Sequence, residues 1–297
     1  MVCSRPPPVA TTQRKARPTT RRHRVAQAEN ESGGRFAYVF YVTNDAYLCY
    51  ALINVHRILN DLDTDPSIEI VLIILESLQT DSYCIEKCFG SRVKLRRVPQ
   101  APHIATNHYY NQCYLRFEAY GLTEYDRVVI LDSDGMVLKN LDHLFHMEME
   151  GKEFAGALAN YENVQWLSAV LQVVIPSKDL HARVSKFIDP VGIKEIAAFA
   201  HGNVYDMDIL NYLFDKGNKA KLLSYHYATL NAFFDQGNEQ EFNSTLYVHY
   251  SKQKPHLFHR TRELNDPSNP YHKLFMLYWE GREKACKTER GEGKMAE

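Results

Sequence analysis

The chain of 297 residues lacks any long hydrophobic run. No window approaches the roughly 18 unbroken apolar residues of a membrane-spanning helix, and no apolar signal segment follows the basic start. We therefore expect no membrane span and a cytoplasmic location. A mitochondrial transit peptide is the minor alternative because the leader is rich in arginine and poor in acid, although the prolines from Pro6 to Pro8 are poor material for an amphipathic helix.

Paired cysteine motifs are also missing. The six cysteines are scattered, and none belongs to a Cys-x-x-Cys pair. Cys84 and Cys88 would share one face of a helix, as a metal pair or as two small buried side chains. Burial is the simpler interpretation, since free cysteine is among the most buried residue types. A reducing compartment is then the simpler expectation.

Glycine-rich phosphate-binding motifs are absent too. The chain has no Gly-x-Gly-x-x-Gly after its first expected strand and no Gly-x-x-x-x-Gly-Lys-Ser/Thr anywhere. Both motifs use glycine to bring backbone amides onto phosphate, so their absence argues against a dinucleotide-binding or P-loop site. The body of the chain also has no basic stripe interleaved with aromatic residues, so nucleic acid is not an expected partner.

The composition is that of an ordinary globular protein, with 45% hydrophobic and 24% charged residues. The net charge of -1 hides an asymmetry, because the leader carries a cluster of cations and no acid before Glu29. These cations are Arg5, Arg14, Lys15, Arg17, Arg21, Arg22 and Arg24. We expect a disordered basic tail at 1–34, one catalytic domain at 35–285 and a polar C-terminal tail at 286–297.

Strand and helix patterns alternate from Phe36 onward. Strands are expected at 36–43, 68–75, 93–98, 127–132, 154–158, 168–175 and 245–250. Helices are expected from Asp45 as a cap, from about 81, and at 111–120, 178–188, 205–214 and 271–279. The alternation predicts an α/β fold with a mostly parallel sheet flanked by helices, and ligands bind such sheets beyond the carboxyl ends of the strands.

The strand that begins at Arg127 ends in the sequence Asp132-Ser133-Asp134. Side chains at i and i+2 point to the same side of a strand, so the two carboxylates converge on one cation. A hard divalent ion held by one or two carboxylates keeps positions that are commonly filled by nucleotide phosphates. The segment therefore predicts a nucleotide held through its diphosphate, although turns favour Asp and Ser and the motif alone is weak.

Three segments in this order resemble glycosyltransferase family 8, which includes glycogenin and galactinol synthase. They are Thr43 to Tyr47, Leu122 to Asp134 with its continuation to Phe145, and Val248 to Pro255. The similarity spans about 36–256. It implies a single glycosyltransferase A-type, Rossmann-like domain that uses Mn²⁺ and a UDP-sugar donor and transfers a hexosyl group with retention of configuration.

The resemblance also implies roles for individual residues. The metal ligands are Asp132, Asp134 and His249, and the nucleotide-binding residues are Thr43, Asn44, Tyr47, Arg116, Ser133 and Lys254. Within the second set, Tyr47 lies against the uracil base, Arg116 stands where the family usually has a phosphate-binding lysine, and Lys254 matches the diphosphate lysine. Taken singly, each has a structural alternative, such as a core aromatic, a surface arginine or a buried histidine.

The expected catalytic residues are Asp206, Met207 and Lys254, and Met207 and Asn203 are among the positions that depart from the family pattern. Met207 replaces the glutamine that usually faces the reacting sugar, and Asn203 stands where an acidic sugar contact is common. A methionine cannot hydrogen-bond a hydroxyl as an amide does, so specificity is expected to differ from glycogenin.

The alternative is a UDP-sugar-binding protein of the same fold with little or no activity. A third hypothesis is a metal-dependent nucleotidyltransferase, which the late motif His249-Tyr250 does not favour. The acceptor is a carbohydrate or a protein, and a homodimer is a candidate assembly. The sequence leaves three questions open: which sugar is transferred, whether the protein glycosylates itself, and how Met207 and Asn203 affect activity.

Overall fold

The structure is a computed structural model that describes residues 34–79, 85, 88–100, 111–159, 165–200, 204–234, 239–257 and 266–285. Outside the described residues lie 1–33 of the tail expected at 1–34, the tail expected at 286–297, the helix start near 81, Cys84 and Asn203. Within them, no helix is long and apolar enough to cross a membrane.

A seven-stranded sheet forms the centre of the molecule, in the order β3-β2-β1-β4-β7-β6-β8. The strands are β1 (Phe36–Val42), β2 (Glu69–Leu75), β3 (Val93–Val98), β4 (Arg127–Leu131), β6 (Phe154–Leu158), β7 (Leu167–Val174) and β8 (Lys221–Leu223). The pairings among β1 to β4 are parallel, and β7 runs antiparallel to both β4 and β6. The expected α/β class with a mostly parallel sheet is confirmed.

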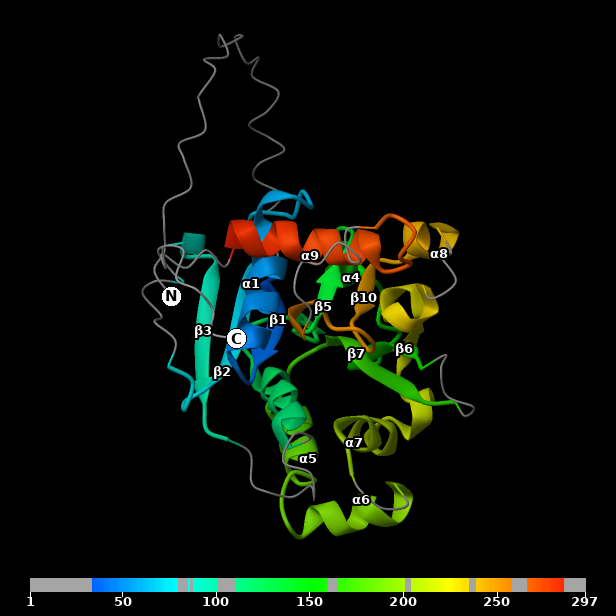
Figure 1. Cartoon of the computed structure of the whole chain (residues 1–297). Helices are drawn as coiled ribbons and strands as arrows, with labels where there is room; N and C mark the ends of the chain where they lie inside the picture. Colours follow the sequence, from blue (N-terminus) through cyan, green and yellow to red (C-terminus); the bar gives the residue numbers. More distant parts are fainter. Residues whose placement is uncertain are drawn as a thin grey trace, which may run out of the picture.

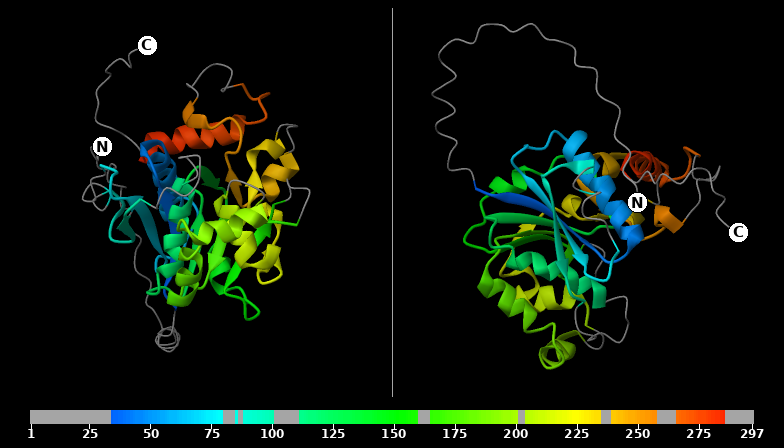
Figure 2. Two further views of the ribbon diagram at one scale, coloured as in Figure 1. Left: turned by 90° about the horizontal axis from the view of Figure 1, so that it is seen from below. Right: turned by 90° about the vertical axis from the view of Figure 1, so that its left-hand side faces the viewer.

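Helices cover both faces of this sheet, which makes three layers (Figure 1). On one face lie α1 (Asp45–Asn60) and, outside it, α9 (His272–Ala285). On the other lie the 3₁₀ helix η2 (Gln112–Gly121), α5 (Lys178–Ser185), α6 (Gly192–Ala200) and α7 (Asp206–Leu213). The right view in Figure 2 shows α1 (blue) and α9 (red) together, apart from the green helices.

The sequence of β1 explains why both faces are covered. Successive strand residues point to opposite faces. Tyr38 and Phe40 pack in the core beneath α1, whereas Val39 and Tyr41 pack in the core with η2 and α7. A strand buried on both faces is therefore nearly continuous in apolar residues, as parallel sheets require.

A second sheet of three short strands lies beyond the end of β4, in the order β5-β10-β9. Its strands are β5 (Gly135–Val137), β10 (Tyr247–His249) and β9 (Thr229–Leu230). Asn54 of α1 fixes β5, because its amide donates to Gly135 O at 2.9 Å and accepts from Val137 N at 2.9 Å. A side chain at position 135 would place its Cβ 1.9 Å from the Tyr247 hydroxyl, so only glycine fits there.

The remaining elements are short and connect these layers. They are α4 (His143–His146), η3 (Asp215–Gly217), η4 (Tyr225–Tyr227), η5 (Asn231–Phe234), α8 (Glu239–Ser244) and η6 (Pro255–Leu257).

Two expectations are wrong in detail. The cap of α1 is Asn44 and not Asp45, because the Asn44 side chain accepts from Tyr47 N at 3.0 Å and the helix begins at Asp45. Cys49 and Cys88 are disulfide-bonded, whereas Cys113 is free. Disulfides form and persist in oxidising environments, so the cysteines no longer support a reducing compartment.

Candidate active site

A cavity of about 610 Å³ opens beyond the carboxyl ends of β1 and β4. These strands are parallel neighbours, so the residues that follow them meet at one edge of the sheet. The polar wall contains Arg116, Asp132, Asp134, Asp206, His249 and Lys254, and the apolar wall contains Trp166, Val170, Met207 and Leu230. The cavity thus brings together all the metal and catalytic residues expected from the sequence.

Asp132, Asp134 and His249 are close enough to share one cation, since one ligand atom from each lies within 4.8 Å of the other two. His249 Nε2 is 3.3 Å from Asp134 Oδ1 and 3.8 Å from Asp132 Oδ2. The pairing of β10 with β5 sets His249 opposite Gly135, one residue after Asp134. Two carboxylates and an imidazole suit Mn²⁺ and similar divalent ions, so the donor set fits the implied metal.

Arg116 lies buried beneath the carboxylates and not at the cavity mouth. Its Nη2 is 2.5 Å from Asp132 Oδ1, and its Nε is 2.9 Å from Asp206 Oδ2. Nη1 donates to Ala169 O, and Nη2 also contacts the Tyr41 hydroxyl. Burial alone would lower the pKa of Arg116, but the two carboxylates outweigh it and hold that pKa well above its ordinary value. Every guanidinium nitrogen therefore has a protein acceptor, so a role in positioning Asp132 and Asp206 is better supported than direct phosphate binding.

Lys254 is the ion-pair partner of Asp134, the second carboxylate of the site. Its Nζ donates to Asp134 Oδ2, lies 3.3 Å from the Tyr47 hydroxyl and sits 5.3 Å from the centre of the Tyr47 ring. Burial raises the pKa of the Asp134 carboxyl, but the charges of His249 and Lys254 outweigh that effect and hold the pKa below its ordinary value. The motif residues from the first and last segments therefore meet at one carboxylate.

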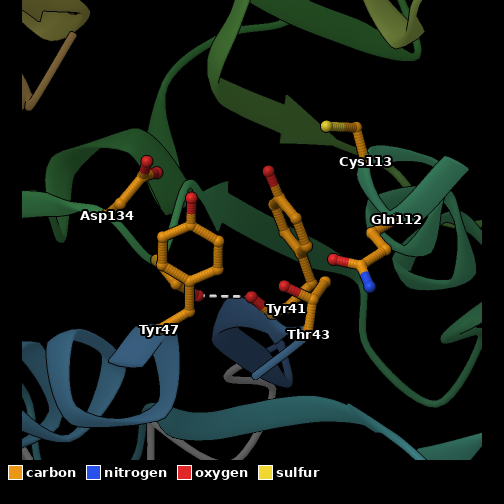
Figure 3. Close-up of a pocket in the computed structure, with 7 residues that line it drawn as sticks. Tyr41, Thr43, Tyr47, Gln112, Cys113 and Asp134 are labelled. Carbon is orange, nitrogen blue, oxygen red and sulfur yellow. Dashed lines mark hydrogen bonds between the residues drawn. The ribbon is translucent and has the colours of Figure 1, made fainter. Parts of the chain in front are cut away.

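A narrow pocket adjoins the large cavity, between the rings of Tyr41 and Tyr47 (Figure 3). Both ring hydroxyls point the same way, with the Asp134 carboxylate beside Tyr47 and the Cys113 thiol beside Tyr41. Thr43, Gln112 and Ser133 also line it. The Ser133 hydroxyl donates to the backbone oxygen of Tyr41 and ties the Asp-x-Asp turn to β1.

Of the expected nucleotide-binding residues at the end of β1 and the start of α1, Thr43 and Tyr47 line this space. The side-chain oxygen of Asn44 instead caps α1, and its amide is 3.5 Å from the Thr43 hydroxyl. Sequence reasoning missed Gln112 and Cys113. Their only signal is their position three or four residues before Arg116 on the same helix.

Helix α7 supplies the other wall of the cavity. Asn211 fixes it to β7, because its side chain accepts from Leu167 N at 2.6 Å and donates to Leu167 O at 3.0 Å. This anchoring places Asp206 and Met207 at the cavity. Asp208, which sequence reasoning did not single out, also lines it and accepts from Tyr205 N at 2.7 Å. Burial, with a smaller contribution from Asp206, raises the pKa of Asp208 to about 6.

The fold is similar to those of solved glycosyltransferases. A galactosyltransferase, LgtC, solved in complex with donor and acceptor sugar analogues, aligns with a TM-score of 0.57 at 17% identity, over 82% of this chain and 95% of that one. The fold is the glycosyltransferase A type. This confirms the expected fold class. No family model matches the chain.

Sequence similarity extends to curated proteins of two kinds. Glucose N-acetyltransferase 1 of Gibberella zeae is 27% identical over 195 residues, which cover 61% of this chain and 40% of that protein. UDP-glucuronate:xylan alpha-glucuronosyltransferase 2 of Arabidopsis thaliana is 32% identical over 126 residues, or 40% of this chain and 20% of that protein. This glycosyltransferase A-type chain therefore spans less than half the length of the curated relatives it matches. The resemblance to nucleotide-sugar transferases is confirmed.

Proposed function

We propose that the protein is a metal-dependent glycosyltransferase that moves a hexosyl group from a UDP-sugar to a carbohydrate or protein acceptor, with retention of anomeric configuration. The observation that carries the proposal is the convergence of Asp132, Asp134 and His249 at the strand ends, with Lys254 and Tyr47 beside them. These residues come from three distant segments, and the fold brings them to one cavity. A glycosyltransferase A fold makes a nucleotide-sugar the natural ligand for that arrangement.

The arrangement assigns a part to each side chain. Mn²⁺ held by the two aspartates and His249 would neutralise charge on the diphosphate. Lys254 supplies a second cation beside Asp134, where it can stabilise the leaving UDP. Tyr47 presents a ring next to the metal site for the uracil base, and Ser133 fixes the turn between the two aspartates.

The acceptor step requires no strong protein base. In a front-face displacement the glycosidic bond to the phosphate breaks, the bond to the acceptor oxygen forms on the same side, and the departing phosphate oxygen takes the acceptor proton. The protein then acts chiefly by holding the two substrates in the geometry in which they react. The apolar wall with Met207 and Val170 contributes shape to the sugar-binding side.

The test is release of UDP from a panel of donors. Purified protein is incubated with UDP-glucose, UDP-galactose, UDP-N-acetylglucosamine and UDP-glucuronate, with Mn²⁺ or with chelator, and with mixed saccharide acceptors. We expect Mn²⁺-dependent release from one donor, loss of release in Asp134→Ala, and no change in the matched surface variant Asp179→Ala. The anomeric coupling of the product by NMR reports retention. UDP release that is unchanged both by chelator and by Asp134→Ala would contradict the proposal.

The same preparation separates the alternative of an inactive binder. Calorimetry with UDP and Mn²⁺ measures binding independently of transfer. Saturable UDP binding, together with no UDP release from any donor with any acceptor, would favour the inactive binder. The observation that supports this alternative is Met207 at the cavity wall. Light scattering of this sample also tests the predicted homodimer.

A further inference from the structure

The two aspartates of the metal site have different counterions. Asp132 is paired with Arg116, whose side chain is 3% exposed and bonded on every nitrogen. Asp134 is paired with Lys254, whose side chain is 20% exposed. An arginine in a filled network is fixed in place, whereas lysine is a point charge on a flexible four-carbon stem. The second counterion is therefore the more exposed and the more flexible of the two.

Lys254 and a bound cation would compete for the same carboxylate. The ammonium sits on Asp134 Oδ2, while Oδ1 of that carboxylate is 3.3 Å from His249 Nε2, at the edge shared with Asp132. A divalent ion on Oδ1 and the ammonium on Oδ2 would be bound to the same carboxylate. These two positive charges would repel each other strongly in a partly buried site. The ammonium therefore opposes the arrival of the metal.

Lys254 contacts two parts of the proposed nucleotide site. Its Nζ spans from Asp134, a proposed metal ligand, to Tyr47, the proposed partner of the uracil base. The backbone at Gln253 is in the left-handed region at φ 46°, and Pro255 begins η6 immediately afterwards. This tight turn aims the lysine into the site from a short connection, and its stem is long enough to follow a phosphate anion away from the carboxylate.

We propose that Lys254 is an exchangeable counterion, which neutralises Asp134 in the free protein and transfers to the diphosphate when nucleotide and cation bind together. The inference rests on the proposed function and deepens it. Lys254 then lowers the affinity of the free protein for the metal and raises the affinity of the metal-loaded protein for nucleotide. The two ligands are positively coupled through one side chain, and the coupling is reciprocal.

The experiment measures Mn²⁺ binding by calorimetry and by the EPR signal of free Mn²⁺, with and without UDP. It compares the wild type, Lys254→Met and the exposed control Lys194→Met. Without UDP, we expect Lys254→Met to bind Mn²⁺ about fivefold more tightly than the wild type, a size ordinary for coupling between sites. With saturating Mn²⁺, we expect the same variant to bind UDP at least about tenfold more weakly, because a charge-assisted contact is lost. The control matches the wild type in both arms.

Opposite changes in the two arms are what a merely structural lysine would not give. Unchanged or weaker Mn²⁺ binding by Lys254→Met, with UDP binding intact in the wild type, overturns the exchange and leaves the proposed function standing. A wild type that binds no UDP with Mn²⁺ overturns both. Lys254→Gln, which keeps a hydrogen-bonding side chain without the charge, replaces the methionine variant if thermal melting shows that Lys254→Met is not folded, and the same signs are expected.

Discussion

Asp132 and Asp134 are two residues apart and face the same cavity, but they are held in opposite ways. Asp132 receives Arg116 from beneath, and this arginine also binds Asp206 at the start of α7. Asp134 pairs with Lys254, whose side chain is partly exposed and which lies in the loop between β10 and η6. The first carboxylate thus joins β4, η2 and α7 into one unit, whereas the second belongs to the part of the site that exchanges ligands.

This difference divides the site into a structural half and a responsive half. Breaking a buried ion pair leaves an uncompensated charge in the protein interior, which is strongly destabilising. Breaking a partly exposed pair returns a lysine to water at little cost. Equal chemical changes at the two aspartates should therefore have unequal effects on folding, although both remove a metal ligand.

The largest effect is expected from Arg116→Met, which removes the buried cation between Asp132 and Asp206. The free energy of unfolding should fall by about 3–5 kcal/mol, and transfer activity should be lost. Arg116→Lys should recover only part of the stability, because an ammonium cannot span the two acids as a guanidinium does. Urea denaturation measures both, with Arg183→Met as an exposed control expected to change stability by about 1 kcal/mol or less. An Arg116→Met protein as stable as the control would refute the structural role.

The next effect separates the two aspartates. Asp132→Asn should lower the free energy of unfolding by about 2–4 kcal/mol, since Arg116 loses one of its two carboxylates. Asp134→Asn should lower it less, by about 1–2 kcal/mol, because its partner Lys254 is partly exposed and can return to water. Both should weaken Mn²⁺ binding by at least about a hundredfold, because each removes an anionic ligand. Melting curves and Mn²⁺ titrations on the pair give the comparison directly, and equal losses of stability would remove the distinction drawn between the two halves.

The sequence predicted the buried strands and the metal cluster better than the contacts between distant segments. The run Phe36–Val42 and the strand before Asp132 are apolar on both faces, and such runs have few alternatives to a buried parallel strand. The resemblance implied that Asp132, Asp134 and His249 form one metal site, and the structure brings them together. In these segments local pattern and tertiary packing agree.

The sequence pattern did not predict the features that depend on tertiary contacts alone. Strands β5 and β9 have three and two residues, too few for a periodic signal, and β5 depends on Asn54 from α1. The burial of Arg116 followed from acids contributed by β4 and α7, which no spacing along the chain reveals. Contacts between distant segments decide which side chains stay fixed and which can move, and sequence order does not contain them.

A smaller effect is expected at the apolar wall. Met207→Gln restores an amide where the family pattern has glutamine, and it places a hydrogen-bonding group at the cavity. We expect a change of about tenfold in the ratio of kcat/KM between two donors, because a single sugar contact contributes on this scale. Stability should stay close to that of the wild type. Steady-state kinetics with each UDP-sugar measures the ratio, and an unchanged donor ranking would show that this wall does not contact the sugar.

The smallest effect concerns Asp208, on the α7 side of the cavity. Its pKa is raised from the ordinary 3.8 to about 6, mainly by burial, so the folded protein holds this proton more tightly than the unfolded chain does. A raised carboxyl pKa favours the folded state fully below about pH 4, and that contribution is lost as the pH rises through 6. Asp208→Asn keeps an acceptor for Tyr205 N and cannot ionise. Relative to the wild type, the variant should therefore gain about 1 kcal/mol in unfolding free energy between pH 4 and pH 8, a figure already reduced for solvent screening. Urea denaturation at both pH values measures this gain. A difference between the two proteins that is the same at both pH values would mean that the carboxyl titrates normally, and that this end of α7 is as open to water as the surface.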